Sequence, residues 1–159
     1  MPQKIPVALL CISLSAAFAD VNAAQKPLDP QRAVTLADVQ MLLAGKFEAR
    51  VVEPGIVKYE EVGGPRVVEV WLSILDPGRT LDSLKETIIG HGEPVEDVPG
   101  VGDIAIYRPQ SGRLMVDRKT KAGENQSLEI IVHNVEAADA KAATKRLAIE
   151  LAKRAAAKP

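Results

Sequence analysis

The middle of the chain consists of short alternating segments that are separated by turn residues. In 66–75 every second residue is apolar, namely Val68, Val70, Leu72 and Ile74, and this period of two is typical of a strand with one buried face. Glycine and proline residues mark turns between these segments. Within 50–75 and within 103–133, no helical pattern lies between one segment and the next. We therefore predict a mainly antiparallel sheet. Its strands are expected at 50–52, 56–60, 66–75, 103–107, 113–118 and 128–133.

Three helices are expected beside these strands. Thr35 and Thr80 each precede an apolar stripe of helical period, and a glycine follows each stripe. The two helices align at an offset of 45 residues, which fits an internal duplication of an α-β-β unit, although helix-capping preferences alone would also produce it. A terminal helix is predicted over 135–157, with Asn134 as its N-cap. The fold class is α+β, with the helices packed on one face of the sheet.

The N-terminal residues form a pattern that is typical of a secretory signal peptide. Lys4 precedes a run from residue 5 to residue 19 that is almost entirely apolar and shorter than the roughly 20 apolar residues that span a bilayer. Small residues at its end allow cleavage after Ala19 or Ala23. We therefore predict a signal peptide over 1–23, a flexible leader over 24–33, a single α+β domain over 34–158, and a periplasmic or secreted location.

The cysteine count and the charge balance exclude several classes of protein. Cys11 is the only cysteine and lies inside the predicted signal peptide, so the mature chain has neither a disulfide nor a multi-cysteine metal centre. Leu10 precedes it, where a lipid-anchored cysteine usually follows a small residue, so no stable membrane anchor is expected. The formal net charge is −1, whereas a nucleic-acid-binding domain carries a basic excess. The apolar core alone is expected to hold the domain together.

The alternation also defines a second face of the sheet, which carries a mixture of rings and charges. Trp71 lies on this face in 66–75, and Arg113 does so in 113–118. In 103–107 we assign Ile104 and Ile106 to the core, which leaves Tyr107 on the second face. Amphipathic rings mixed with charges are typical of a recognition surface. We predict that a ligand or partner binds here through Trp71, Tyr107, Arg113, Met115, Ile131 and His133.

Patterns for catalysis or for a metal are sparse. The sequence has no nucleophile elbow, phosphate loop or dinucleotide fingerprint. His91 and His133 lack the spacing of zinc ligands, so neither a metal nor a cofactor is predicted. The segment Gly100-Val101-Gly102 precedes a predicted strand and not a helix, as a phosphate-binding loop would. We therefore expect a structural turn in which Asp103 accepts hydrogen bonds from nearby backbone amides. An enzyme that uses Asp103, Glu129 and His133 is kept as an alternative.

Several short motifs resemble those of small exported bacterial domains of unknown function. They are the capped helix over 36–45, the string over 100–105, a strand pair, and the alanine-rich terminal helix with Leu147-Ala148 and Leu151-Ala152. Many such domains are lipoproteins and some carry paired cysteines. This sequence has neither a lipid-anchor cysteine at the end of its predicted signal peptide nor a pair of cysteines. The resemblance covers most of residues 35–155 and implies an exported, non-enzymatic α+β module with no catalytic residue.

These patterns together predict an exported accessory binding module rather than an enzyme. The expected partner is an envelope protein or a small ligand, recognised through the second face of the sheet. An inhibitor or immunity-type protein is one version of this function. A hydrolase-like enzyme is the alternative, and the sequence leaves the oligomeric state open.

Overall fold

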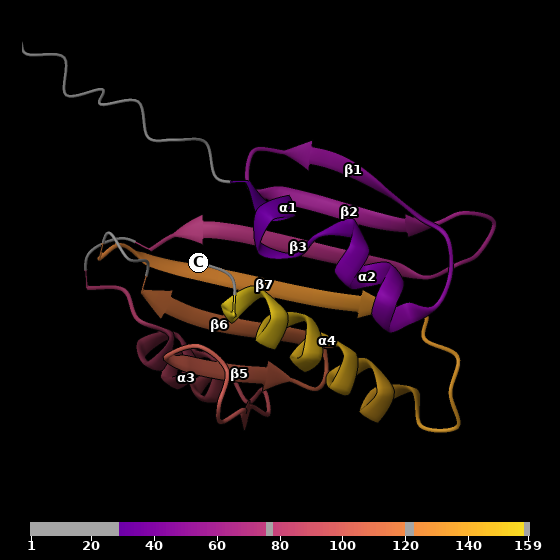
Figure 1. Cartoon of the computed structure of the whole chain (residues 1–159). Coiled ribbons are helices and arrows are strands. Elements are labelled where there is room, and N and C mark those ends of the chain that lie inside the picture. The colour runs from indigo at the N-terminus through magenta and orange to yellow at the C-terminus, as the bar shows by residue number, and fades with distance from the viewer. Residues whose placement is uncertain (1–28, 76–77, 120–122, 158–159) are drawn as a thin grey trace, which may run out of the picture.

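Residues 29–75, 78–119 and 123–157, which the computed structural model describes, form one antiparallel sheet with helices on both sides (Figure 1). The predicted signal peptide and residues 24–28 lie outside this part of the chain. The strands of the described residues are β1 (Phe47–Glu53), β2 (Ile56–Glu61), β3 (Val67–Ile74), β4 (Glu96–Asp97), β5 (Ile104–Arg108), β6 (Arg113–Lys119) and β7 (Asn125–His133). The helices are α1 (Pro30–Ala33), α2 (Leu36–Leu43), α3 (Leu81–Gly90) and α4 (Ala140–Ala156). The predicted α+β class is confirmed.

The sheet is built from two meanders that meet at its centre. Its strand order is β1-β2-β3-β7-β6-β5-β4, and every neighbouring pair is antiparallel. The two-residue turn Pro54-Gly55 joins β1 to β2, and the turn over 109–112 joins β5 to β6, as the turn residues of the sequence predict. The long strands β3 and β7 pair over their whole length, with Val70 opposite Ile130. The most continuous backbone pairing therefore lies in the middle of the sheet.

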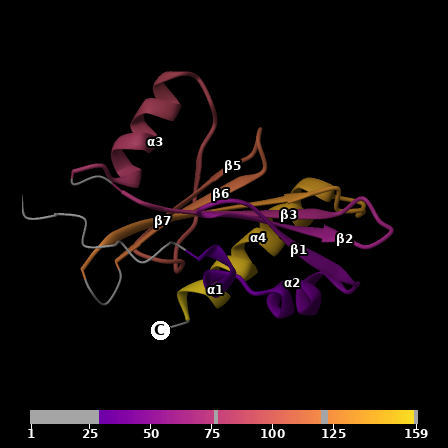
Figure 2. The ribbon, with the colours of Figure 1, turned by 90° about the horizontal axis from the view of Figure 1, so that it is seen from above.

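Helices α1, α2 and α4 cover one face of the sheet and enclose the main core with it (Figure 2). The alanines of α4 are small enough to let the helix lie close to β6 and β7. Tyr59 on β2 is fully buried, and its hydroxyl donates to the Val34 carbonyl just before α2. This core contains Val39 and Leu43 of α2, Phe47, Val57, Tyr59, Val68 and Val70 of β1–β3, Leu114, Leu128 and Ile130 of β6–β7, and Ala148, Leu151, Ala152 and Ala155 of α4.

Local capping determines where the helices begin. Of the three helices that the sequence predicts, α2 and α3 begin at the predicted caps and α4 does not. Thr35 accepts from the Asp38 amide, and the Asp38 carboxylate accepts from the Thr35 amide at 2.8 Å, which completes a capping box. Thr80 caps α3 in the same way. Helix α4 begins later than predicted, at the N-cap Asp139, because Asn134 adopts a positive φ of 57° and its amide donates to Pro65. No helix in the described ranges is long and apolar enough to cross a membrane.

The start of the domain also differs from the predicted boundary. Residues 30–33, which we expected in the flexible leader, form the short helix α1. Ala33 is buried in the main core, and Asp29 caps the helix by accepting from the Gln31 amide. Residues 30–33 are therefore part of the packed domain and not of a flexible leader.

Helix α3 lies on the opposite face of the sheet, which corrects the expectation that all helices share one face (Figure 2). Leu81 and Ile88 of α3 pack against Ile106 and Met115 of the sheet in a second, smaller apolar cluster. The order of a helix followed by strands does occur twice in the chain. However, α2 and α3 cover opposite faces, so the two halves are not superimposable copies of the predicted α-β-β unit.

Candidate functional site

The second face of the sheet, defined as the face away from α2 and α4, is covered over one half and open over the other. Helix α3 packs on β5 and β6. Exposure alternates along β3, as expected when only one face is covered, whereas Ala105, Ile106 and Tyr107 of β5 are all buried. The boundary between the covered and the open half lies over β6, β7 and β3, and a pocket is found there.

This pocket, which we call the α3 pocket, has a volume of about 440 Å³ and lies between the first turns of α3 and the second face. Its floor follows the strand pairing, in which Ser73, Ser127 and Asp117 form one cross-strand row. The sheet side contributes Ser73, Leu75, Met115, Asp117, Ser127 and Glu129. The helix side contributes Arg79, Thr80, Leu81, Ser83, Leu84 and Thr87.

Asp117 is the most deeply buried charged group of the pocket, with 9% of its surface exposed. Its Oδ2 accepts from the Leu81 amide at 2.7 Å, so the carboxylate satisfies one of the free N–H groups at the start of α3. Its Oδ1 is also buried and has no hydrogen-bond partner among the described residues. Because its neighbours enclose this oxygen, it does not itself open to the pocket.

The surroundings of Asp117 disfavour its charge. Burial raises the pKa of this carboxyl group, and the negative charges of Asp82 and Asp103 act in the same direction. The Leu81 amide and the Ser127 hydroxyl oppose the change but do not outweigh it. A perturbed titratable group that lines a pocket is typical of a functional site.

The hydroxyl groups of the pocket differ in their availability. On α3, Ser83 donates to the Thr80 carbonyl at 2.8 Å, and Thr87 donates to the Ser83 carbonyl at 3.0 Å. These hydroxyls are therefore engaged in the helix. On the sheet, Ser127 is buried and Ser73 is exposed, and both flank Asp117 on the pocket floor. The floor thus combines one carboxylate with two small hydroxyl groups.

Glu129 connects the pocket with Trp71, the only tryptophan of the chain. Arg113 forms an ion pair with Glu129 at 2.8 Å, and its guanidinium carbon lies 5.7 Å from the centre of the Trp71 ring. The Trp71 indole N–H lies 3.4 Å from Glu69. Arg113 therefore holds one of the two carboxylates of the pocket, and the Trp71 ring lies beside Arg113.

Ion pairs occupy the open half of the second face. Glu69 pairs with Lys58 at 2.7 Å, and His133 Nε2 lies 3.6 Å from the same carboxylate. Partial burial would raise the pKa of Glu69, but the hydrogen bonds from Lys58 and Trp71 and the charge of Lys58 outweigh it, so the pKa is lowered. This half of the face presents paired charges rather than an apolar surface.

The predicted binding residues are thus only partly brought together. Arg113, Trp71 and His133 lie on the second face as expected, and so do Met115 and Ile131, although both of these are buried. Met115 lies beneath α3 and lines the pocket.

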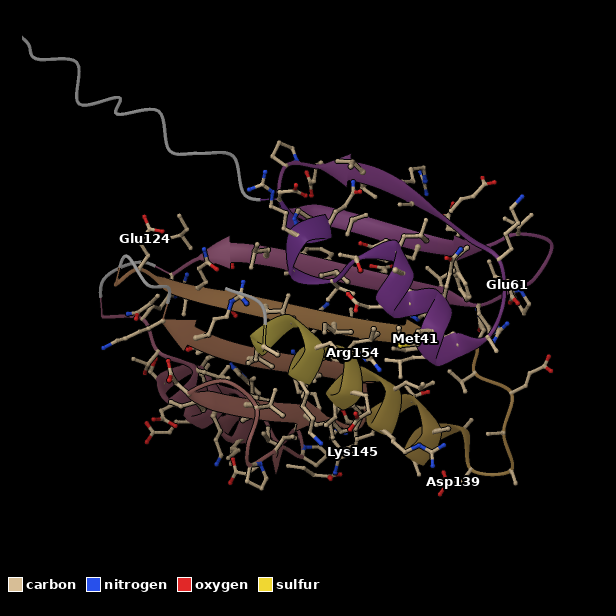
Figure 3. All side chains as sticks on the ribbon, in the orientation of Figure 1. Met41, Glu61, Glu124, Asp139, Lys145 and Arg154 are labelled. Carbon is tan, nitrogen blue, oxygen red and sulfur yellow. The ribbon has the colours of Figure 1, made fainter. Side chains whose placement is uncertain are left out.

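Tyr107 is the exception, because it points into the main core and is only 3% exposed. The ammonium of Lys145, which is labelled on α4 in Figure 3, lies 5.5 Å from the centre of its ring. The strand assignment was wrong because α3 supplies a second apolar environment. Ile104 and Ile106 face α3, and Ala105 and Tyr107 face α4. When both faces of a strand are covered, alternation no longer identifies the core side.

The residues of the alternative enzyme do not converge. Asp103 Oδ2 accepts from the Lys119 amide of β6 at 2.9 Å, so its role is structural, but its partner lies 16 residues along the chain and not in the local turn that we predicted. Glu129 and His133 lie four positions apart on β7, about 13 Å along a strand. Within the described ranges no group of three or more His, Cys, Asp or Glu could hold a metal ion.

The chain was compared with protein-family models, with curated proteins and with solved structures. None of them matches it. What the pocket binds is therefore inferred from its own side chains.

The sequence did not single out Asp117 and Ser127, which are the pocket residues of greatest interest. Alternation in 113–118 places Asp117 on the second face with Arg113 and Met115, but it gives no reason to single Asp117 out. One signal was present in the sequence. The apolar stripe of α3 needs an apolar surface to cover, and Met115 and Ile106 of the second face provide it.

Proposed function

We propose that this protein is an exported binding module that takes a small ligand in the α3 pocket. The observation that carries the proposal is a pocket of about 440 Å³ between α3 and the sheet, which is lined by apolar side chains together with the largely buried Asp117. A concave site with apolar walls and a few convergent polar groups is the usual form of a small-molecule site. Met115, Leu81 and Leu84 supply such walls.

The other binding residues act at the border of this site. Arg113, which lies beside the Trp71 ring, holds Glu129 at the pocket wall, and an ordered carboxylate there fixes the orientation of a ligand without a large entropy cost on binding. On the open half of the face, the side chains are already paired with one another. A small ligand in the pocket therefore fits the arrangement better than a large protein partner on the open half.

Helix α3 offers a pair of sites for a matched test. Leu84 is 39% exposed and lines the pocket, whereas Ile89 is 52% exposed on the same helix and does not line it. A tryptophan at Leu84 fills the mouth of the pocket, and a tryptophan at Ile89 adds the same bulk elsewhere. Fragments that raise the melting temperature of the wild type should do so for I89W and fail to do so for L84W. Equal stabilisation of both variants would place binding elsewhere.

The exported location rests on the sequence pattern of residues 1–23 and is tested separately. Expression of the full chain in a bacterial host should give a mature protein in the envelope or the medium. Its mass should correspond to cleavage after Ala19 or Ala23. A full-length product that stays in the cytoplasm would contradict this part of the proposal.

A further inference from the structure

Strand β1 forms a free edge of the sheet (Figure 1). It pairs with β2 on one side, and no strand of the described ranges lies on its other side. The Val62 amide donates to the Lys46 carbonyl, and the antiparallel ladder continues from this pair. Because backbone bonds to one neighbour recur at every second residue, the N–H and C=O groups of Ala49 and Val51 point away from β2. Such an edge is a template for a further strand.

The same strand exposes apolar side chains. Val51 is 57% exposed and Val52 is 46% exposed. Protein edges are often protected by bulges, which twist the edge away from a partner. In β1 the irregularity comes only between Val51 and Glu53, at the end of the strand. The stretch Phe47–Val51 therefore keeps the regular geometry that strand pairing requires.

The charges of this stretch are arranged symmetrically about Ala49. Glu48 and Arg50 flank it, and alternation from the buried Phe47 places both on the second face. When two copies of β1 pair antiparallel with Ala49 opposite Ala49, Glu48 of each copy lies opposite Arg50 of the other. These two positions form non-hydrogen-bonded pairs, in which the side chains approach most closely, so two equivalent ion pairs can form.

The neighbouring registers are less favourable. The outward backbone groups also face each other when the pairing is centred on Glu48 or on Arg50. Either register puts like charges directly opposite each other, which is destabilising. Within the described ranges Glu48 forms no ion pair, whereas Arg50 is paired with Glu60. The register centred on Ala49 thus supplies the partner that Glu48 lacks.

We propose that two copies of this protein associate through antiparallel pairing of their β1 strands, centred on Ala49, so that the two sheets become continuous. The Phe47 carbonyl accepts from Gln40 Nε2 at 3.5 Å, but a carbonyl oxygen has a second lone pair for the partner. A single strand edge is a small interface, so the dimer should dissociate on dilution. The α3 pocket is lined by α3 and by strands away from this edge, so the inference does not depend on the proposed function.

Sedimentation of the purified protein over a concentration series measures the association, and NMR hydrogen exchange locates it. A dimer should form as the concentration rises, and the protection of the Ala49 and Val51 amides should rise with it. A protein that stays monomeric up to about 1 mM, the weak limit of specific binding, would overturn the inference. So would protection of these two amides that is independent of concentration, since the chain itself would then cover the edge.

Ala49→Pro tests the edge directly. The Ala49 N–H does not bond β2, so proline at this position removes no hydrogen bond of the sheet but blocks the centre of the dimer. A49P should be a folded monomer at concentrations where the wild type is a dimer, with its folding verified by the melting temperature. A dimer that A49P leaves intact would use another surface and would overturn the inference.

Charge reversals test the register, and they remain informative if A49P is unstable. Glu48→Arg and Arg50→Glu each place like charges opposite each other at two symmetric positions, so each should weaken the dimer about tenfold. The double variant E48R/R50E restores opposite charges, and its affinity should return to within about twofold of the wild type. Lys153→Glu, an exposed reversal on α4, is the control and should change the affinity less than about twofold. A double variant that is as weak as the single ones would overturn the register.

Discussion

Few buried contacts attach helix α3 to the sheet, so its opening should be separable from unfolding of the whole domain. The contacts are the cluster of Leu81, Ile88, Ile106 and Met115, together with the hydrogen bond from the Leu81 amide to Asp117. Helices α2 and α4, in contrast, share the large main core. Elements with small buried areas open at lower free energy than the core. The stability of α3 therefore depends strongly on each residue of its cluster.

Truncation of Leu81 to alanine measures this dependence, with Leu84→Ala as the matched control. Leu81 is 2% exposed and Leu84 is 39% exposed, on the same helix and one turn apart. Both variants make the same side-chain truncation in α3, so the difference between them reports chiefly the loss of buried contacts. A buried leucine costs about 2–5 kcal/mol when truncated to alanine. Leu84 borders an open pocket, so its truncation leaves no closed cavity and should cost about 1 kcal/mol or less.

Native-state hydrogen exchange is the appropriate measurement, because it reports each element separately. In L81A the protection of the α3 amides should fall about 30-fold or more, since each ~1.4 kcal/mol is a factor of ten. The amides of β3 and β7 in the centre of the sheet should keep their protection. Equal losses in α3 and in β3, or equal losses in L81A and L84A, would refute the separate attachment of α3.

Three further predictions concern the rest of the domain. Gly100 and Gly102 both have a positive φ, but only at Gly102 would an added Cβ lie 2.6 Å from the Asp117 carbonyl oxygen. Urea unfolding should therefore show Gly102→Ala to be about 1–3 kcal/mol more destabilising than Gly100→Ala. Tyr59→Phe should cost about 1–3 kcal/mol, because the fully buried carbonyl before α2 loses its donor. The lowered pKa of Glu69 stabilises the fold above its ordinary titration range, and this contribution is lost as pH falls through the lowered pKa. The stability difference between the wild type and E69Q should therefore shrink in acid.

The parts of the fold that local chemistry determines could be predicted from the sequence. The capping box of Thr35 and Asp38 involves residues three positions apart, so the sequence alone locates the start of α2. Strand β3 has one covered face, and its alternation assigned Val68 and Val70 to the core correctly. Asn134 and Asp139 are equally good caps by type. Only the tertiary contact of Asn134 with Pro65 decides between them, so the start of α4 was misplaced.

The placement of α3 depends on long-range packing, and the sequence could not determine it. Ile106 and Tyr107 are both apolar enough to face a core, and either orientation of β5 would bury one of them. The choice follows from which helix covers which face, and α3 could cover either face from its position in the chain. Because Asp117 becomes buried only when α3 lies above it, the candidate site was hidden for the same reason.

The candidate site and the attachment of α3 are consequently coupled. Asp117 caps α3 through Oδ2 and also lines the pocket, so a ligand in the pocket lies beside the group that holds the helix. Without a ligand, the cost of the buried charge opposes the docking of α3. The pocket is lined by both α3 and the sheet, so a ligand can occupy it only while the helix is docked. Ligand binding must therefore stabilise α3 against opening in proportion to its affinity for the docked form. The protection of the α3 amides should reveal an occupied pocket even where the central sheet shows no change.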